Sequence, residues 1–106
     1  MGVNTLTFHL TTAGAKLVVD YSAGDPLPSN NIILDGGGLS NTQLTIIGGS
    51  TPLLFNDTQV GEVDGPSITY SNLAGITFSN SEVHFQGTLE NLQYLTIDAG
   101  TVFYWS

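Results

Sequence analysis

Short apolar runs follow one another along the chain and alternate with polar turn residues. The runs are rich in Val, Ile, Leu, Tyr and Phe, and Gly, Pro, Asn, Asp or Ser separates each from the next. This spacing is typical of many short β-strands and leaves almost no helical periodicity. The pattern predicts ten strands, at Leu6–Leu10, Leu17–Tyr21, Ile32–Leu34, Leu44–Ile47, Leu53–Phe55, Ile68–Tyr70, Ile76–Phe78, Val83–Phe85, Tyr94–Ile97 and Val102–Trp105.

Proline and glycine predict where the chain leaves the strands. The segment 23–28 contains two prolines, which lack backbone donors, so we expect an outside loop there. Gly65-Pro66 is a second expected corner. The one candidate for a helical turn is Ser71–Gly75, which Gly75 would end at once.

A short element recurs along the chain: Leu or Ile, then Thr, then an aromatic residue or Ile. Its copies are Leu6-Thr-Phe, Leu44-Thr-Ile, Ile68-Thr-Tyr, Ile76-Thr-Phe and Leu95-Thr-Ile. Several are followed by a Gly or Asn turn, as expected where apolar residues of successive coils stack and a corner needs left-handed backbone. The central Thr would then point outward.

The repeat predicts an all-β fold, a short parallel β-solenoid (β-helix) of about four to five coils in which residues 1–106 form a single domain. An antiparallel β-sandwich would show the same alternation and remains the alternative. Its hairpins would favour Asp-Gly turns between matched strands. The two such dipeptides, at Asp35 and Asp64, are followed by further glycines or by proline.

Charge is the feature that excludes most partners. Lys16 is the only Lys or Arg against nine Asp and Glu, which gives a formal net charge of −8. The chain therefore has no basic surface for nucleic acid, and no apolar run is long enough for membrane insertion. Only 9% of residues are charged, well below the roughly 25% of typical soluble domains. We expect a secreted or cell-surface protein whose export signal lies outside this chain.

The glycine-rich stretch Asp35–Ser50 raises the question of calcium. Gly36–Gly38 and Leu44–Ile46 resemble the two ends of the calcium-roll nonapeptide, with Asn41 near a liganding position. The copy is degenerate and has no intact neighbour. It therefore predicts a plain corner, in which at least one of Gly36–Gly38 has positive φ.

The remaining candidates for chemistry are few. His9 and His84 are the only imidazoles, and Glu82 and Glu90 flank His84 as a conceivable acid and base pair. Both histidines sit in alternating strand patterns and predict structural or surface roles. No motif for nucleophilic catalysis or phosphate binding is present. The sequence predicts no catalytic residue, no cofactor and no metal site. It leaves open whether the acidic stretch with Asp57, Glu62 and Asp64 holds a weak calcium ion.

A broader resemblance is carried by three segments, 17–28, 33–38 and 64–73. They resemble the tandem repeats of very large secreted bacterial surface proteins of the adhesin or autotransporter-passenger type. The resemblance implies a coil-stacked fragment of a larger repeat protein, a spacer or stalk with no enzymatic activity. The alternative is an adhesin module that binds a glycan or a surface protein through exposed aromatic residues, for which the candidates are Tyr21, Tyr70, Tyr94, Tyr104 and Trp105.

The C-terminal stretch Val102–Ser106 holds four consecutive large apolar or aromatic residues. Because the ends of stacked β-structures expose unpaired backbone groups, we expect this stretch to cap the last coil. The hypothesis predicts that Phe103 and Trp105 are largely buried. It also predicts self-association through the ends when the cap is removed.

Overall fold

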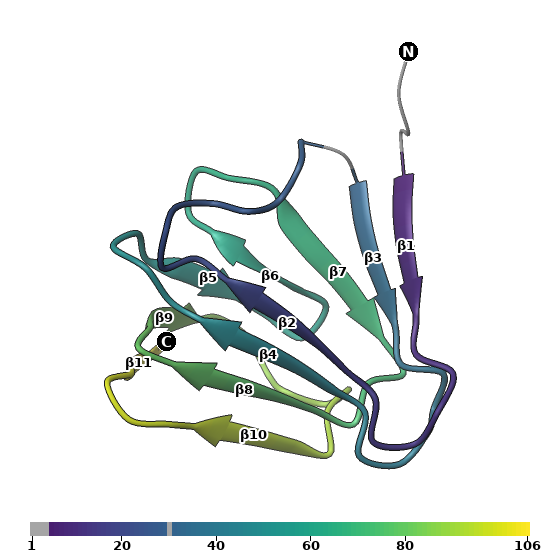
Figure 1. The fold of residues 1–106 in the computed structure, drawn as a ribbon. Helices are drawn as coiled ribbons and strands as arrows, with labels where there is room; N and C mark the ends of the chain where they lie inside the picture. Colours follow the sequence, from purple (N-terminus) through teal and green to yellow (C-terminus); the bar gives the residue numbers. More distant parts are fainter. Residues whose placement is uncertain (1–4, 30) are drawn as a thin grey trace.

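The computed structural model of the chain describes residues 5–29 and 31–106 (Figure 1). These residues form eleven β-strands and no helix. The strands are β1 (Thr5–His9), β2 (Lys16–Asp20), β3 (Asn31–Asp35), β4 (Gln43–Ile47), β5 (Leu53–Phe55), β6 (Gln59–Glu62), β7 (Ser67–Ser71), β8 (Gly75–Ser79), β9 (Glu82–Phe85), β10 (Tyr94–Ile97) and β11 (Val102–Trp105).

The all-β prediction is confirmed, and each of the ten predicted strands is present within one residue of its expected bounds. Strand β6 was not predicted, because Gln59–Glu62 contains a single large apolar residue, Val60. Pairing with two neighbouring strands explains why this segment is nevertheless a strand. Val60 pairs with Phe55 of β5 and with Ile68 of β7, and its side chain is buried between them.

The predicted loop at 23–28 and the corner at Gly65-Pro66 lie outside the strands, as expected. The helical turn predicted at Ser71–Gly75 is wrong. Strand β7 ends at Ser71 and β8 begins at Gly75, and between them Asn72 adopts a φ of 53°. A single left-handed residue turns the chain there, and asparagine tolerates that conformation better than most side chains.

The strands form two sheets. The four-stranded sheet has the order β10-β8-β4-β2 and is parallel throughout. The seven-stranded sheet has the order β1-β3-β7-β6-β5-β9-β11 and is mixed. Within the described residues its two antiparallel pairings are those of β6 with β5 and with β7. Because the other pairings are parallel, an antiparallel sandwich is wrong for this chain.

Figure 1 shows β2, β4, β8 and β10 as one layer of arrows that point the same way, with β9 and β11 fainter behind them. Similar residues stack across this layer. Leu44 of β4 pairs with Leu17 of β2 and with Ile76 of β8, and Ile76 pairs in turn with Leu95 of β10. Leu44 and Ile76 are fully buried.

Side chains alternate between the core and the surface along most strands. In β7 the apolar Ile68 and Tyr70 are buried while Thr69 is exposed. The predicted outward position of the central Thr is confirmed, because Thr45 and Thr77 are half-exposed and Thr96 is exposed. The core is a continuous cluster that includes Leu, Ile, Val, Phe and Tyr side chains from both sheets.

Aromatic rings form the centre of the core. The ring of Phe55 lies 5.2 Å from that of Phe78 and 5.1 Å from that of Phe85, measured between centroids. These separations are typical of packed aromatic pairs.

No helix in the described part of the chain is long and apolar enough to cross a membrane.

Candidate functional site

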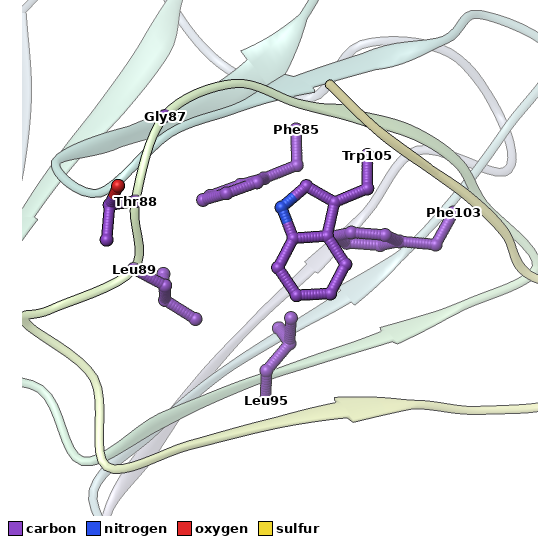
Figure 2. Close-up of a pocket in the computed structure, with 7 residues that line it drawn as sticks. All are labelled: Phe85, Gly87, Thr88, Leu89, Leu95, Phe103 and Trp105. Carbon is purple, nitrogen blue, oxygen red and sulfur yellow. The ribbon is translucent and has the colours of Figure 1, made fainter.

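An apolar groove lies among β9, β10, β11 and the loop that follows β9 (Figure 2). Its volume is about 430 Å³. The residues that line it are Phe85, Gly87, Thr88, Leu89, Leu95, Phe103 and Trp105. These side chains carry no charge, and the only polar groups among them are the Thr88 hydroxyl and the Trp105 indole N–H. The groove can contact apolar or planar groups, but its side chains offer no acid or base.

Trp105 lies at the mouth of this groove and is 78% exposed, whereas Phe103 is half-buried. The indole packs edge-on against Phe85 and Phe103, with centroids 6.2 Å and 6.3 Å away. The predicted burial of Trp105 is therefore wrong. Strand β11 is the last strand in the order of its sheet, so among the described residues no further strand pairs with its outer edge.

A second aromatic surface lies on the opposite side of β11. Tyr104 is 48% exposed, and its ring stacks on that of His84 at 4.6 Å with an interplanar angle of 10°. The His84 Nε2 atom lies 2.7 Å from the Glu82 Oε2 atom. The stacked pair follows from register, because Tyr104 and His84 are direct partners in the parallel pairing of β11 with β9.

The other candidate aromatic residues face inward. Tyr21 and Tyr70 are buried in the core, and they are excluded as platforms for a ligand. Tyr94 is half-buried, and its ring occupies the space where Gly75 has no side chain. The two exposed candidates, Tyr104 and Trp105, are consecutive in one strand and so point to opposite faces. They do not form one aligned platform.

The two histidines are far apart in the sheet. His9 belongs to β1 at one edge of the seven-stranded sheet, whereas His84 belongs to β9 next to the opposite edge. His9 lies 3.4 Å from Asp35, measured from Nδ1 to Oδ2. Each imidazole therefore has its own carboxylate partner, and the two do not share a site.

The candidate acidic residues also lie in separate parts of the fold. The backbone of Glu90 donates to Asp57 at 2.9 Å, whereas Glu82 contacts His84, so the conceivable acid and base pair of Glu82 and Glu90 has no support in these contacts. Asp57 lies in the turn between β5 and β6, Glu62 ends β6, and Asp64 is exposed in the next turn. Among the described residues, no three His, Cys, Asp or Glu side chains gather in a way that could hold a metal ion.

The glycine-rich stretch is a corner followed by a strand. Gly37 and Gly38 have φ values of 67° and 70°, which confirms the expected positive φ, and Asn41 has a φ of 58°. The Asp35 Oδ1 atom accepts a hydrogen bond from the Gly37 backbone at 2.8 Å and one from the Asn72 side chain at 3.4 Å. These bonds, the one from Gly37 first, lower the pKa of Asp35 below its ordinary value.

Two features of the site were missed by the sequence reasoning. The apolar groove could not be predicted from the sequence, because the sequence of a strand does not show whether other elements cover its side chains. Asp25, in the proline-containing loop, lies near the side chain of Glu62 beside Gly65, and only the tertiary structure brings these two residues together. Comparisons of the chain with protein-family models, with curated proteins and with solved structures find no match.

Proposed function

We propose that this chain is a non-catalytic structural segment, a spacer or stalk of a secreted or cell-surface protein, built as a short parallel β-solenoid. The observation that carries the proposal is the register of the four-stranded parallel sheet, in which Leu17, Leu44, Ile76 and Leu95 stack one above another. Stacked identical positions are what a coil repeat requires. On this hypothesis, the four parallel strands represent four coils of one domain.

The surface chemistry supports a structural role. One outward column of the same sheet carries Thr45, Thr77 and Thr96 next to Val18 of β2, so three of its four positions are polar and uncharged. Parallel strands lie about 4.8 Å apart, so four coils extend roughly 15 Å along their axis. A long stalk would therefore need further coils stacked on β2 or β10, the outer strands of this sheet.

Cysteine cross-linking can test the coil register, because the natural chain contains no cysteine. Thr45 and Thr77 are direct partners on neighbouring strands, whereas Thr45 and Thr96 are two strands apart. Only the first pair lies within the range of a disulfide. We expect T45C/T77C to form an intramolecular disulfide on mild oxidation and T45C/T96C to remain reduced. The opposite result would overturn the solenoid assignment.

Stiffness tests the spacer role itself. Val18 and Thr96 lie at the two ends of one outward column, three strand spacings apart. Nitroxide labels on V18C/T96C should give one narrow distance distribution in pulsed electron resonance. A broad or multimodal distribution would show that the stack is not stiff, and would contradict a role as a spacer.

The groove supports a second candidate function, a module that binds a glycan or a surface protein. The observation in its favour is the large exposed indole beside an apolar cavity, since exposed aromatic residues are enriched at binding sites. Trp105 is the only tryptophan, so its fluorescence reports on the groove alone. Titration with soluble oligosaccharides should shift its emission to shorter wavelength if a ligand covers it. An unchanged spectrum across a broad glycan panel would exclude the glycan form of this function.

A further inference from the structure

Strand β11 has one unpaired edge within the part of the chain that the structure describes. In its parallel pairing with β9, the Ser106 N–H donates to the Phe85 carbonyl at 3.1 Å. Neighbouring residues of a strand direct their backbone groups to opposite edges. Phe103 and Trp105 lie an odd number of residues before Ser106, so their N–H and C=O groups point away from β9. The outer edge of β11 therefore presents backbone donors and acceptors from both residues.

The side chains of the same two residues line the apolar groove. Figure 2 shows the Trp105 indole beside Phe103, with Phe85 on one side and Leu95 on the other. Leu95 belongs to β10, which is the last strand of the four-stranded sheet, just as β11 is the last strand of the seven-stranded sheet. Uncovered apolar side chains and unpaired backbone groups thus meet at one end of the molecule. An extended peptide can match both, because it carries alternating side chains and a regular row of donors and acceptors.

The inner strands of this sheet show how such an edge is covered. Strands β5, β9 and β11 are parallel neighbours, and Phe55, Phe85 and Trp105 occupy one column across them. The Phe55 carbonyl accepts a hydrogen bond from the Gln86 N–H, and the Phe85 carbonyl accepts one from the Ser106 N–H, both at 3.1 Å. The Trp105 carbonyl is the next acceptor in this series. A further strand at the β11 edge would continue the series in the same direction and register.

Charge decides which protein supplies that strand. In an end-to-end stack of two copies that continues the four-stranded sheet, Asp98 of one copy would lie next to Asp20 of the other. Like charges directly opposite each other on neighbouring strands are destabilising. Each copy also carries a formal net charge of −8. Charge complementarity therefore favours a segment of another protein with basic residues around an apolar centre.

We propose that the β11 edge and the groove bind an extended segment of a partner protein, which adds to β11 as a parallel strand. Two apolar residues at alternate positions of the segment enter the groove beside Phe103 and Trp105, and the residue between them points outward next to Tyr104. Basic residues on either side complement the acidic protein. This inference rests on the groove as a binding site, the second function proposed above, and is independent of the spacer role.

Synthetic peptides added to the natural protein test the proposal. Each is an acetylated Lys-Thr-X-Thr-X-Thr-Lys amide in which both X residues are Val, Leu or Phe. Because Trp105 is the only tryptophan, its emission should shift to shorter wavelength as peptide is added up to about 1 mM. Peptides with Glu in place of both Lys residues should bind about ten-fold more weakly at low salt.

Methylation of single peptide nitrogens separates strand addition from simple filling of the groove. In the parallel register, the N–H of the central Thr faces β11, whereas the N–H of the second X residue points away from it. Methylation of the central Thr nitrogen should weaken binding by about ten-fold or more, and methylation at the second X residue by less than about two-fold. Equal losses would show that only the side chains bind, and would overturn strand addition.

Protein variants locate the site through the binding of a fluorescently labelled peptide. Trp105→Ala should weaken binding by about ten-fold or more, because it removes the largest apolar contact. Val63→Ala shortens an exposed apolar side chain in the turn after β6 and should bind as the natural protein does. Equal affinities of the two variants would place the peptide elsewhere and overturn the inference.

The remaining outcomes distinguish this inference from the function on which it rests. If none of the peptides shifts the Trp105 emission but an oligosaccharide does, the groove binds glycans, and the inference fails while the binding function stands. If neither class of ligand shifts the emission, both fail. Concentration-dependent association of the natural protein in high salt, lost in Trp105→Ala, would identify a second copy as the occupant and would also overturn the inference.

Discussion

Asp57 accepts two hydrogen bonds from Asn91, 34 residues further along the chain: Oδ1 from the Asn91 backbone at 2.9 Å and Oδ2 from its side-chain amide at 2.7 Å. A third bond comes from the Glu90 backbone. One carboxylate thus joins the β5–β6 turn to the long loop between β9 and β10. The carboxylate of Asp57 therefore has a structural role in this fold.

Asp57→Ala should remove all three of these bonds. Hydrogen bonds to charged groups contribute about 1.5–3 kcal/mol when well shielded and less at the surface. Because this site is exposed, we expect the free energy of unfolding to fall by about 1–2 kcal/mol. Asn91→Ala deletes only the side-chain bond and should cost less than half as much. Urea denaturation measures the free energy of unfolding of both variants. Equal stability of Asp57→Ala and the natural protein would show that the loop is not held by this residue.

The glycines of the 36–38 corner should differ in what they tolerate. Gly38 has positive φ and open space around it, so Gly38→Val should cost about 1–3 kcal/mol from backbone strain, whereas Gly38→Asn should be nearly neutral. Gly36 has no positive φ, but an added Cβ would overlap the Asn72 carbonyl. Gly36→Ala should therefore be at least as destabilising as Gly38→Val. Melting temperatures of Gly38→Val, Gly38→Asn and Gly36→Ala check this order of destabilisation. If none of the three differs from that of the natural protein, Gly36–Gly38 does not form the corner described above.

Tyr70→Phe should destabilise the protein through a single lost bond. The phenol donates to the Asn56 carbonyl at 2.7 Å within the core, so its removal leaves a partly buried acceptor unpaired. We expect a loss of about 0.5–2 kcal/mol in the free energy of unfolding. Tyr104→Phe is the matched control, since Tyr104 is 48% exposed and its hydroxyl can hydrogen-bond to water. A loss of equal size in both variants would argue against the bond to Asn56.

Acid should reveal the role of Asp35. Hydrogen bonds to its carboxylate lower its pKa in the folded state below its ordinary value. The resulting stability is therefore present above the pKa of the unfolded chain and is lost as the pH falls through the folded pKa. Asp35→Asn lacks this ionisation, so the stability difference between it and the natural protein should shrink as the pH falls below about 4. Melting temperatures of both proteins from pH 7 to pH 2 measure this stability difference. If the two melting temperatures fall in parallel over this range, Asp35 contributes nothing to acid sensitivity.

Deletion of Val102–Ser106 tests the C-terminal strand. Although Trp105 is exposed, β11 covers the edge of β9, and its Phe103 packs on the buried Phe85 at 6.1 Å between ring centroids. Removal of β11 would expose an unpaired strand edge and a core aromatic ring, which favours edge-to-edge association. We expect the shortened chain to sediment as concentration-dependent oligomers. A stable monomer with an unchanged melting curve would refute the capping role, whereas Trp105→Ala alone should leave the protein monomeric.

The sequence by itself determined ten of the eleven strands and the outward position of the central Thr in the recurring element. Ten of the strands follow from local alternation, because a half-buried strand must place apolar residues at every second position. The corner at Gly36–Gly38 follows for a similar reason, since only certain residues accept positive φ. The same pattern missed β6, because this segment has only one buried valine. It forms a strand through pairing with the strands on either side.

Tertiary structure alone decided how the strands pair and which polar groups meet. Local alternation is the same in a parallel and an antiparallel sheet, so only the pairing itself excluded the sandwich. The sequence likewise could not show that Trp105 lies uncovered beside a groove, or that Asp25 approaches Glu62. Such contacts join residues tens of positions apart, and they depend on the packing of the whole chain rather than on the preference of any segment.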